Sequence, residues 1–116
     1  MANPNGRKGS AWEIAALKWL RAKGVFAERL RLSGSKDEGD IVAVIAGKTY
    51  VLELKNRKAI SLATFWDEAV KEAKNYAKAR NLEQVPPAFV IVKRRNASVE
   101  KAFVIQDFQS WLDERQ

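Results

Sequence analysis

The segment from Asp40 to Lys55, which reads DIVAVIAGKTYVLELK, constrains the fold more than any other part of the chain. It contains two apolar runs separated by Gly47-Lys48, and a glycine at the first central position is typical of a two-residue β-hairpin turn. A turn at these residues places Asp40 opposite Lys55 and diagonal to Glu53. Because side chains alternate along a strand, all three then lie on one face. The segment therefore predicts two carboxylates and an ammonium gathered on a β-sheet.

Two explanations fit this cluster of charged residues. Carboxylates about 5 Å apart repel each other by roughly 3 kcal/mol at an effective dielectric constant of about 20, and a divalent cation would offset that repulsion. Alternatively, the hairpin faces solvent and Asp40 pairs with Lys55, a contact worth less than about 1 kcal/mol. The first explanation predicts a metal site, and the second predicts an ordinary surface ion pair.

The absence of cysteine and histidine restricts the chemistry of any such site. The chain has no thiolate nucleophile, no disulfide, no histidine general base and no cysteine or histidine ligand for zinc. A metal must therefore be held by oxygen atoms, which favours Mg²⁺, with Mn²⁺ able to substitute for it. We expect no small-molecule cofactor.

The net charge of +7 is unevenly distributed along the chain. Residues 1–36 carry eight basic groups against two acidic ones, whereas residues 37–55 carry four acidic groups against two basic ones. A basic surface around a small acidic site suits a polyanion that is held broadly and attacked at one metal-bound point. The alternative is a basic protein with no role in nucleic-acid binding.

The length of 116 residues predicts a single domain over 1–116, of which residues 1–9 are expected to form a flexible basic arm. No apolar run approaches the roughly 20 residues of a membrane span. The first residues, MANPNGRKGS, contain no apolar signal segment, so we expect a cytoplasmic protein with no membrane partner.

The first predicted helix contains a further candidate carboxylate. Ser10 and Glu13 match a capping box and predict a helix over residues 11–23 that ends before Gly24. Capping alone would account for Glu13, at about 1 kcal/mol. In helical projection, however, Glu13 lies within the apolar stripe, as a side chain directed toward a sheet would. It is therefore also a candidate third carboxylate of the site.

The remaining pattern predicts an α/β fold with a mixed central sheet flanked by helices, in the order αβββαββα. The helix after the hairpin is expected to bury Phe65 and Tyr76 and to expose Glu72 on its polar side. The other expected elements are a strand over 25–32, a loop over 33–39, that helix over 61–79, strands over 88–92 and 102–106, and a short helix capped by Asp107.

Taken together, these motifs resemble the PD-(D/E)XK nuclease superfamily, and within it the archaeal-type Holliday junction resolvases. The resemblance rests on RKGS before Glu13, on the SGSK loop before Gly39-Asp40, and on ELKNRK from Glu53. It spans residues 7–58 in motif and the whole chain in element order. The chain departs from it in having Gly39 where a proline can precede the aspartate, and Ile14 where an arginine often follows the glutamate.

The resemblance implies a restriction-endonuclease-like core and a Mg²⁺-dependent, structure-selective DNA endonuclease that resolves Holliday junctions by paired symmetric nicks. Asp40 and Glu53 would bind the metal with the backbone carbonyl of Leu54, and Glu13 is a further candidate ligand. Lys55 would position the attacking water or stabilise charge on the phosphate.

The implied partners are branched or duplex DNA and a second copy of the chain. Candidate apolar contacts of the homodimer are Phe65, Trp66 and Trp111, although core packing would explain each of them. Two other functions remain open: another nuclease with the same core (nicking, restriction-like or exonucleolytic), and a non-catalytic basic DNA-binding module. The predicted DNA contacts are Arg7, Lys8, Arg29, Arg31, Ser33, Ser35, Lys36, Arg57 and Lys58, with Lys93, Arg94 and Arg95 as further candidates.

Overall fold

The computed structural model describes residues 4–30 and 37–116, and within 4–8 it describes the backbone alone. The predicted order of helices and strands is confirmed, with one short 3₁₀ helix added before the last strand. The elements are α1 (Pro4–Ala22), β1 (Phe26–Arg29), β2 (Ile41–Ile45), β3 (Lys48–Lys55), α2 (Leu62–Ala79), β4 (Ala88–Val92), η1 (Val99–Lys101), β5 (Phe103–Ile105) and α3 (Phe108–Asp113).

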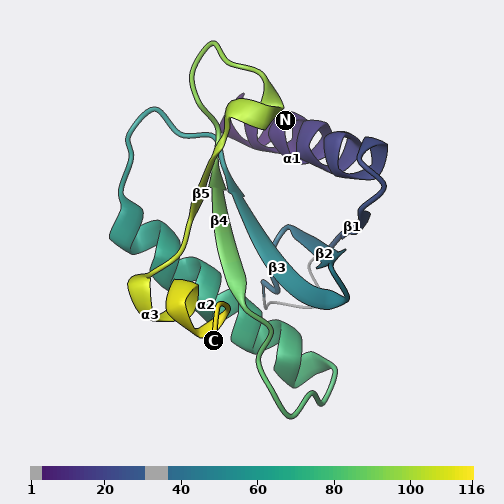
Figure 1. Cartoon of the computed structure of the whole chain (residues 1–116). Coiled ribbons are helices and arrows are strands. Elements are labelled where there is room, and N and C mark those ends of the chain that lie inside the picture. Colours follow the sequence, from purple (N-terminus) through teal and green to yellow (C-terminus); the bar gives the residue numbers. More distant parts are fainter. Residues whose placement is uncertain (1–3, 31–36) are drawn as a thin grey trace.

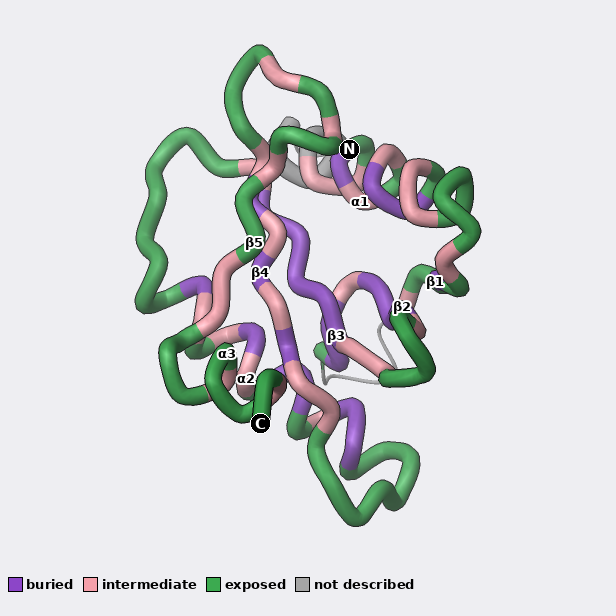
Figure 2. Tube along the Cα trace, in the orientation of Figure 1, coloured by how far each residue is buried: buried purple, intermediate pink, exposed green. Residues whose placement is uncertain are grey.

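The strands form one mixed sheet in the order β1-β2-β3-β4-β5, in which only the β3–β4 pair is parallel. Alternating side chains of each strand bury against opposite layers: Ile41 and Leu52 pack with α1, and Val42 and Val51 pack with α2. The sheet is thus the middle of three layers, and α2 is the crossover between the parallel strands (Figure 1). Buried positions run along β2, β3 and β4 (Figure 2).

The turn of the β2–β3 hairpin differs from the predicted one. It uses Ala46 and Gly47, with φ of 53° and 79°, as in a type I′ turn. The strand pairing is shifted by two residues from the predicted register, which places Glu53 rather than Lys55 opposite Asp40. A two-residue shift leaves every side chain on its original face, so the hydrophobic pattern does not distinguish the two registers. The predicted cluster survives for that reason.

The first helix also differs from its prediction at one end. It begins at Pro4 rather than at residue 11, so the flexible arm predicted over 1–9 is wrong from residue 4 onward. Proline is favoured at the first position of a helix, where no amide donor is required. Ser10 therefore lies inside the helix and is not its cap. The predicted end is confirmed: Gly24 has φ of 78°, and the amides of Gly24 and Val25 bond back to the helix as in a Schellman motif.

The crossover helix α2 corrects one predicted side-chain position. Phe65 and Tyr76 are buried as expected, but Glu72 is also buried and faces the sheet. At 100° per residue Glu72 lies about 20° from Phe65, so the helical projection places it in the buried stripe in spite of its charge. Within the described residues, no helix is both long and apolar enough to cross a membrane.

Candidate metal centre

Asp40 is fixed at the start of β2 by both its backbone and its side chain. Its amide donates to the carbonyl of Leu52 at 3.1 Å, and its carbonyl accepts from the amide of Leu30 at 2.8 Å. Its Oδ2 accepts from the amide of Leu54 at 2.8 Å. The carboxylate is therefore held against the end of β3, with its orientation set by the main chain of the neighbouring strand.

Gly39 explains how the chain reaches this position. Its φ is +102°, a backbone conformation that a side chain with a Cβ rarely adopts, and a Cβ there would lie 2.5 Å from Cγ1 of Val51. Proline, whose ring fixes φ near −65°, could not adopt it at all. The departure from the proline of the resembled motif thus has a backbone cause.

The carboxylates of Glu13, Asp40 and Glu53 form a continuous row. The carboxyl group of Asp40 lies close enough to both of the others to shift their pKa values. Glu13 also accepts from Nη2 of Arg29 at 2.9 Å. The structure therefore brings together the three carboxylates that the sequence predicted, from α1, β2 and β3.

Burial and mutual repulsion raise the pKa values of this row. Desolvation, followed by the interaction with the neighbouring Glu53 carboxyl group, raises the pKa of Asp40 to about 7. Desolvation and the neighbouring Asp40 likewise raise the pKa of Glu13 to about 7, while Arg29 acts in the opposite direction. Desolvation also raises the pKa of Glu53, and the nearby ammonium of Lys55 opposes that effect. Such a row strongly favours binding of a cation or a proton.

Lys55 lies on the same side of β3 as Glu53, as predicted. It is buried, and its Nζ contacts Oε2 of Glu68 at 2.5 Å and lies 5.2 Å from the ring centroid of Phe65. Glu68, on α2, was not predicted as part of the site. Its place three residues after Phe65, which was predicted to be buried, would have been the signal, because residues at i and i+3 are neighbours on a helix surface.

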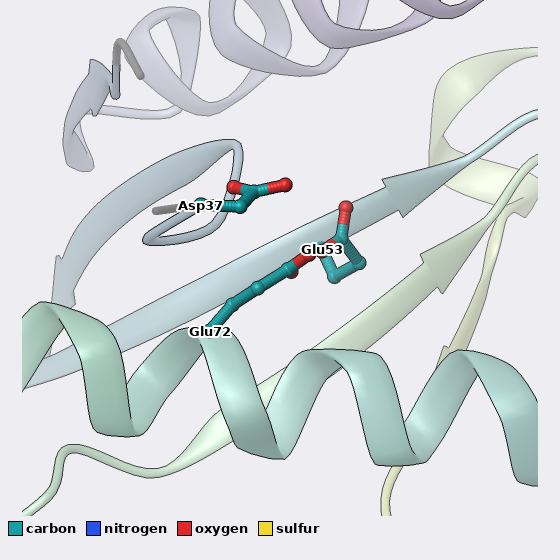
Figure 3. A group of neighbouring side chains, drawn as sticks. All are labelled: Asp37, Glu53 and Glu72. Carbon is teal, nitrogen blue, oxygen red and sulfur yellow. The ribbon is translucent and has the colours of Figure 1, made fainter. Parts of the chain in front are cut away.

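A metal fits the donor set that these residues provide. Glu53 is only 4 % exposed, yet its Oε2 has no hydrogen-bond partner among the described residues. A second buried oxygen, Oε2 of Glu72, is also unpaired, and both belong to a group with Asp37 whose oxygens lie within 4.8 Å of one another (Figure 3). All available donors are carboxylate oxygens, which suits Mg²⁺ or Mn²⁺. Neither Asp37 nor Glu72 was predicted from the sequence.

The row opens into a pocket of about 650 Å³ between α1 and the first strands. Glu13, Asp37 and Asp40 reach this pocket, so the site is accessible to a ligand. The remaining residues that line it are Leu17, Arg21, Glu28, Arg29, Leu30 and Gly39.

A basic groove of about 1070 Å³ begins at Asn56, the residue after Lys55. It forms because β3 and β4 are parallel, so the segments that follow them meet at one edge of the sheet, where the amide of Lys93 donates to the carbonyl of Lys55 at 2.9 Å. The groove thereby combines two predicted sets of DNA contacts, residues 57–58 and residues 93–95. The basic residues that line the groove are Arg57, Lys58, Lys93, Arg94 and Arg95.

Other predicted contacts are placed differently or not at all. Arg29 pairs with Glu13 and belongs to the acidic row rather than to the groove. The carbonyl of Leu54 remains a predicted ligand. The hydrogen bond between Leu54 and Asp40 is made by the amide of Leu54, so it does not test that prediction. Arg31, Ser33, Ser35 and Lys36 lie outside the described residues, as do the side chains of Arg7 and Lys8.

Comparisons with known proteins agree with this architecture. The family model of the archaeal Holliday junction resolvases matches residues 4–105. Among solved structures, Hjc of Archaeoglobus fulgidus, described as a Holliday junction resolvase from an archaeal hyperthermophile, is similar to the chain with a TM-score of 0.53 and 26 % sequence identity. The similarity covers 90 % of this chain and 92 % of that one. No curated protein matches the chain.

Proposed function

The chain belongs to the archaeal Holliday junction resolvase family, and we propose that it resolves four-way DNA junctions by paired, symmetric nicks that require Mg²⁺. Membership makes it a structure-selective DNA endonuclease. The paired nicks, the identity of the ion and the roles of individual residues are the proposed part. The observation that carries them is the pair formed by the half-buried Asp40 and the buried Glu53, whose Oε2 has no hydrogen-bond partner among the described residues and which lies beside a buried lysine.

Asp40, Glu53 and the carbonyl of Leu54 would hold the ion, with Glu13 beside them. Bound there, Mg²⁺ would supply Lewis acidity toward a phosphate oxygen and the attacking water. The amide of Leu54 keeps the Asp40 carboxylate oriented at 2.8 Å before any ligand arrives. Arg29 orients Glu13 from the opposite end of the row.

Lys55 is proposed to stabilise the negative charge that develops on the phosphate. Its ammonium is buried beside Glu53, where a charge acts more strongly than it would in water. The contact with Glu68 fixes the long side chain, so little reorganisation is needed during the reaction. Glu68 is therefore a positioning residue.

The basic groove is proposed to bind the DNA backbone next to the acidic row. Its five cations would neutralise phosphates, and binding should weaken steeply as salt increases. No helix of the described residues presents a set of side chains for reading base edges near the groove, whose lining comes from loops, strands and the first residue of α2. We therefore propose selection by DNA structure rather than by sequence.

Two symmetric cuts require two sites, so the proposal includes a homodimer. The proposed interface, here called the β5 face, consists of the edge strand β5 and the start of α3, which follows it directly in the chain (Figure 1). Val104 is 62 % exposed and Phe108 is 80 % exposed, and they line one pocket with Leu62 and Trp111. Exposed apolar patches on an edge strand are typical of protein contacts. A second copy of the chain is the proposed partner at this face, because two symmetric cuts require two active sites.

The two other predicted interface residues are placed less favourably. Phe65 is buried against the sheet, so it belongs to the core and is withdrawn from the interface. Trp66 is partly buried, and its Nε1 donates to Oδ2 of Asp107 at 3.2 Å. Trp111 therefore remains the tryptophan best placed for a dimer contact.

Cleavage of a labelled four-way junction, compared with its linear duplex in Mg²⁺ and in EDTA, tests the proposal. We expect paired nicks in the junction alone, lost in EDTA and in Asp40→Asn, with binding retained. Asp67→Asn, an exposed change on α2, serves as the matched control and should cut normally. Normal cutting by Asp40→Asn would overturn the site. Equal cutting of both DNAs would indicate another nuclease, and tight binding without cutting would indicate a binding module.

A further inference from the structure

A second group of carboxylates lies on the α2 side of Glu53. Asp37, Glu53 and Glu72 offer three carboxylate oxygens that all lie within 4.8 Å of one another. They come from the segment before β2, from β3 and from α2, and the Glu72 side chain extends from the helix toward the other two (Figure 3). Glu72 has no place in the row of Glu13, Asp40 and Glu53, and the proposed cleavage reaction does not use it.

Two members of this group, Glu53 and Glu72, are buried and need a partner that the described residues do not supply. Glu53 and Glu72 are 4 % and 8 % exposed, and the Oε2 atom of each has no hydrogen-bond partner among the described residues. Two ionised carboxylates at this separation repel by roughly 3 kcal/mol at an effective dielectric constant of about 20. Unpaired buried carboxylates are costly, and natural proteins pair them or use them to coordinate metals.

The nearby cations have other partners. Lys55 contacts Glu68, and Arg80 contacts the buried Glu38 at 3.1 Å. The amide group of Asn75 donates to the backbone carbonyl of Asp37 at 2.8 Å. The contacts of Asn75 and Arg80 tie the Asp37 segment to α2. Among the described residues no ion pair involves Glu53 or Glu72, so Lys55 offsets their negative charge only in part, from a position beside Glu53.

We infer that Asp37, Glu53 and Glu72 form a second divalent-cation site, which shares Glu53 with the site at Asp40. An ion such as Mg²⁺ or Mn²⁺ would take one oxygen from each residue and complete its coordination with water, as small divalent ions usually do. Asp37 is exposed and lines the open pocket, which gives the ion a route of entry. Its position as the neighbour of a catalytic ion rests on the proposed function, whereas cation binding itself does not.

The number of Mn²⁺ ions bound by the metal-free protein tests this inference without DNA. Calorimetric titration of the full chain should give two ions per chain for the wild type and for the control Asp67→Asn, which removes an exposed carboxylate from the same helix. Glu72→Gln and Asp40→Asn should each leave one ion, and Glu53→Gln should weaken both. Electron paramagnetic resonance of Mn²⁺ should show coupling between two ions in the wild type and none in Glu72→Gln.

The outcomes separate the second site from the proposed function. Unchanged Mn²⁺ stoichiometry and spectrum in Glu72→Gln, with thermal unfolding showing a folded variant, would overturn the inference and assign Glu72 a shared proton instead. No ion in the wild type would overturn it as well, and Mg²⁺-dependent junction cleavage would still decide the function separately. Loss of one ion in Glu72→Gln would support the second site even if the junction were not cut.

Discussion

At Gly39 a single missing side chain determines where the Asp40 carboxylate lies. The φ of this glycine is +102°, and a Cβ at this position would lie only 2.5 Å from Cγ1 of Val51. Replacement by alanine must move either the loop or β3, and Asp40 is the next residue. Local backbone conformation and site geometry are therefore coupled at this position.

We predict that Gly39→Ala lowers the free energy of unfolding by about 2 to 4 kcal/mol, because overpacking and an unfavourable φ add together. Urea denaturation measures the change. Gly9→Ala is the matched control: a Cβ there meets no atom within 4 Å, and alanine favours the helix by about 1 kcal/mol. Equal stability of the two variants would contradict the strain assigned to Gly39.

The raised pKa values of Asp40 and Glu13 predict how the stability of the metal-free protein depends on pH. Their folded pKa values of about 7 lie above their ordinary values of 3.8 and 4.5, so the folded state binds more protons than the unfolded state between these limits. The free energy of unfolding should therefore fall as pH rises from about 4 to about 7, and then level off. Affinity for Mg²⁺ should rise over the same range, because the ion needs ionised carboxylates.

Urea denaturation in EDTA at about pH 5 and about pH 8 measures this slope. Asp40→Asn should reduce it, because the variant removes one titrating group and its repulsion of Glu13. Asp67→Asn should leave the slope unchanged. A metal-free protein that becomes more stable between the two pH values would contradict the assigned direction.

At the scale of elements, α2 does more than connect the parallel strands. It supplies Glu68 to Lys55 and Glu72 to the second carboxylate group, and it holds the segment before β2 through Asn75 and Arg80. The guanidinium of Arg80 also lies 3.8 Å from the ring centroid of Tyr76. One helix face therefore organises both the lysine and the loop that leads to Asp40.

We predict that Arg80→Ala destabilises the protein by about 1 to 3 kcal/mol, because it leaves the buried carboxylate of Glu38 without its partner. Adding Glu38→Gln should recover part of the loss. Lys78→Ala, an exposed change on the same helix, should stay within about 0.5 kcal/mol. Chemical denaturation distinguishes these cases, and an equal loss in the single and double variants would show that the pair is not responsible.

The hairpin and α2 show which parts of the site could be predicted from the sequence and which could not. Alternation along the strands placed Asp40, Glu53 and Lys55 on one face, even though the turn was predicted one residue too far along. Glu72 was misplaced because its charge was taken as a sign of exposure, whereas the helical projection puts it beside Phe65. Burial can be predicted from the sequence where the buried side chains are apolar and recur with the period of a strand or helix. A buried carboxylate follows from tertiary packing, which one strand or helix does not reveal.

At the scale of the whole molecule, the proposed assembly depends on the β5 face. The edge strand and the start of α3 expose apolar side chains together, which is costly for a monomer. The fold class and element order were predictable from the sequence. The joining of residues 56–58 with residues 93–95 in one groove was not, because it depends on the parallel pairing of β3 with β4.

We predict that Phe108→Arg converts the protein from dimer to monomer and replaces paired nicks by single, uncoordinated ones. The side chain is 80 % exposed and does not line the basic groove, so the fold itself should be unaffected. Sedimentation at micromolar concentration, together with the pattern of nicks, measures the effect. Leu82→Arg, which changes another exposed apolar side chain to a charged one in the segment after α2, should remain dimeric. A monomeric wild type would remove the symmetric-cut model.

The indole of Trp12, which donates to the carbonyl of Ile91 at 3.3 Å, joins the first helix to a strand that lies 79 residues later in the chain. During synthesis the apolar side of α1 therefore cannot pack against β4 until β4 has left the ribosome. At ordinary elongation rates this delay is roughly 4 to 16 s. For that interval Trp12, Ala16 and Leu17 have no β4 to pack beside, and nascent chains of this protein would be suitable clients for a chaperone that binds amphipathic helices.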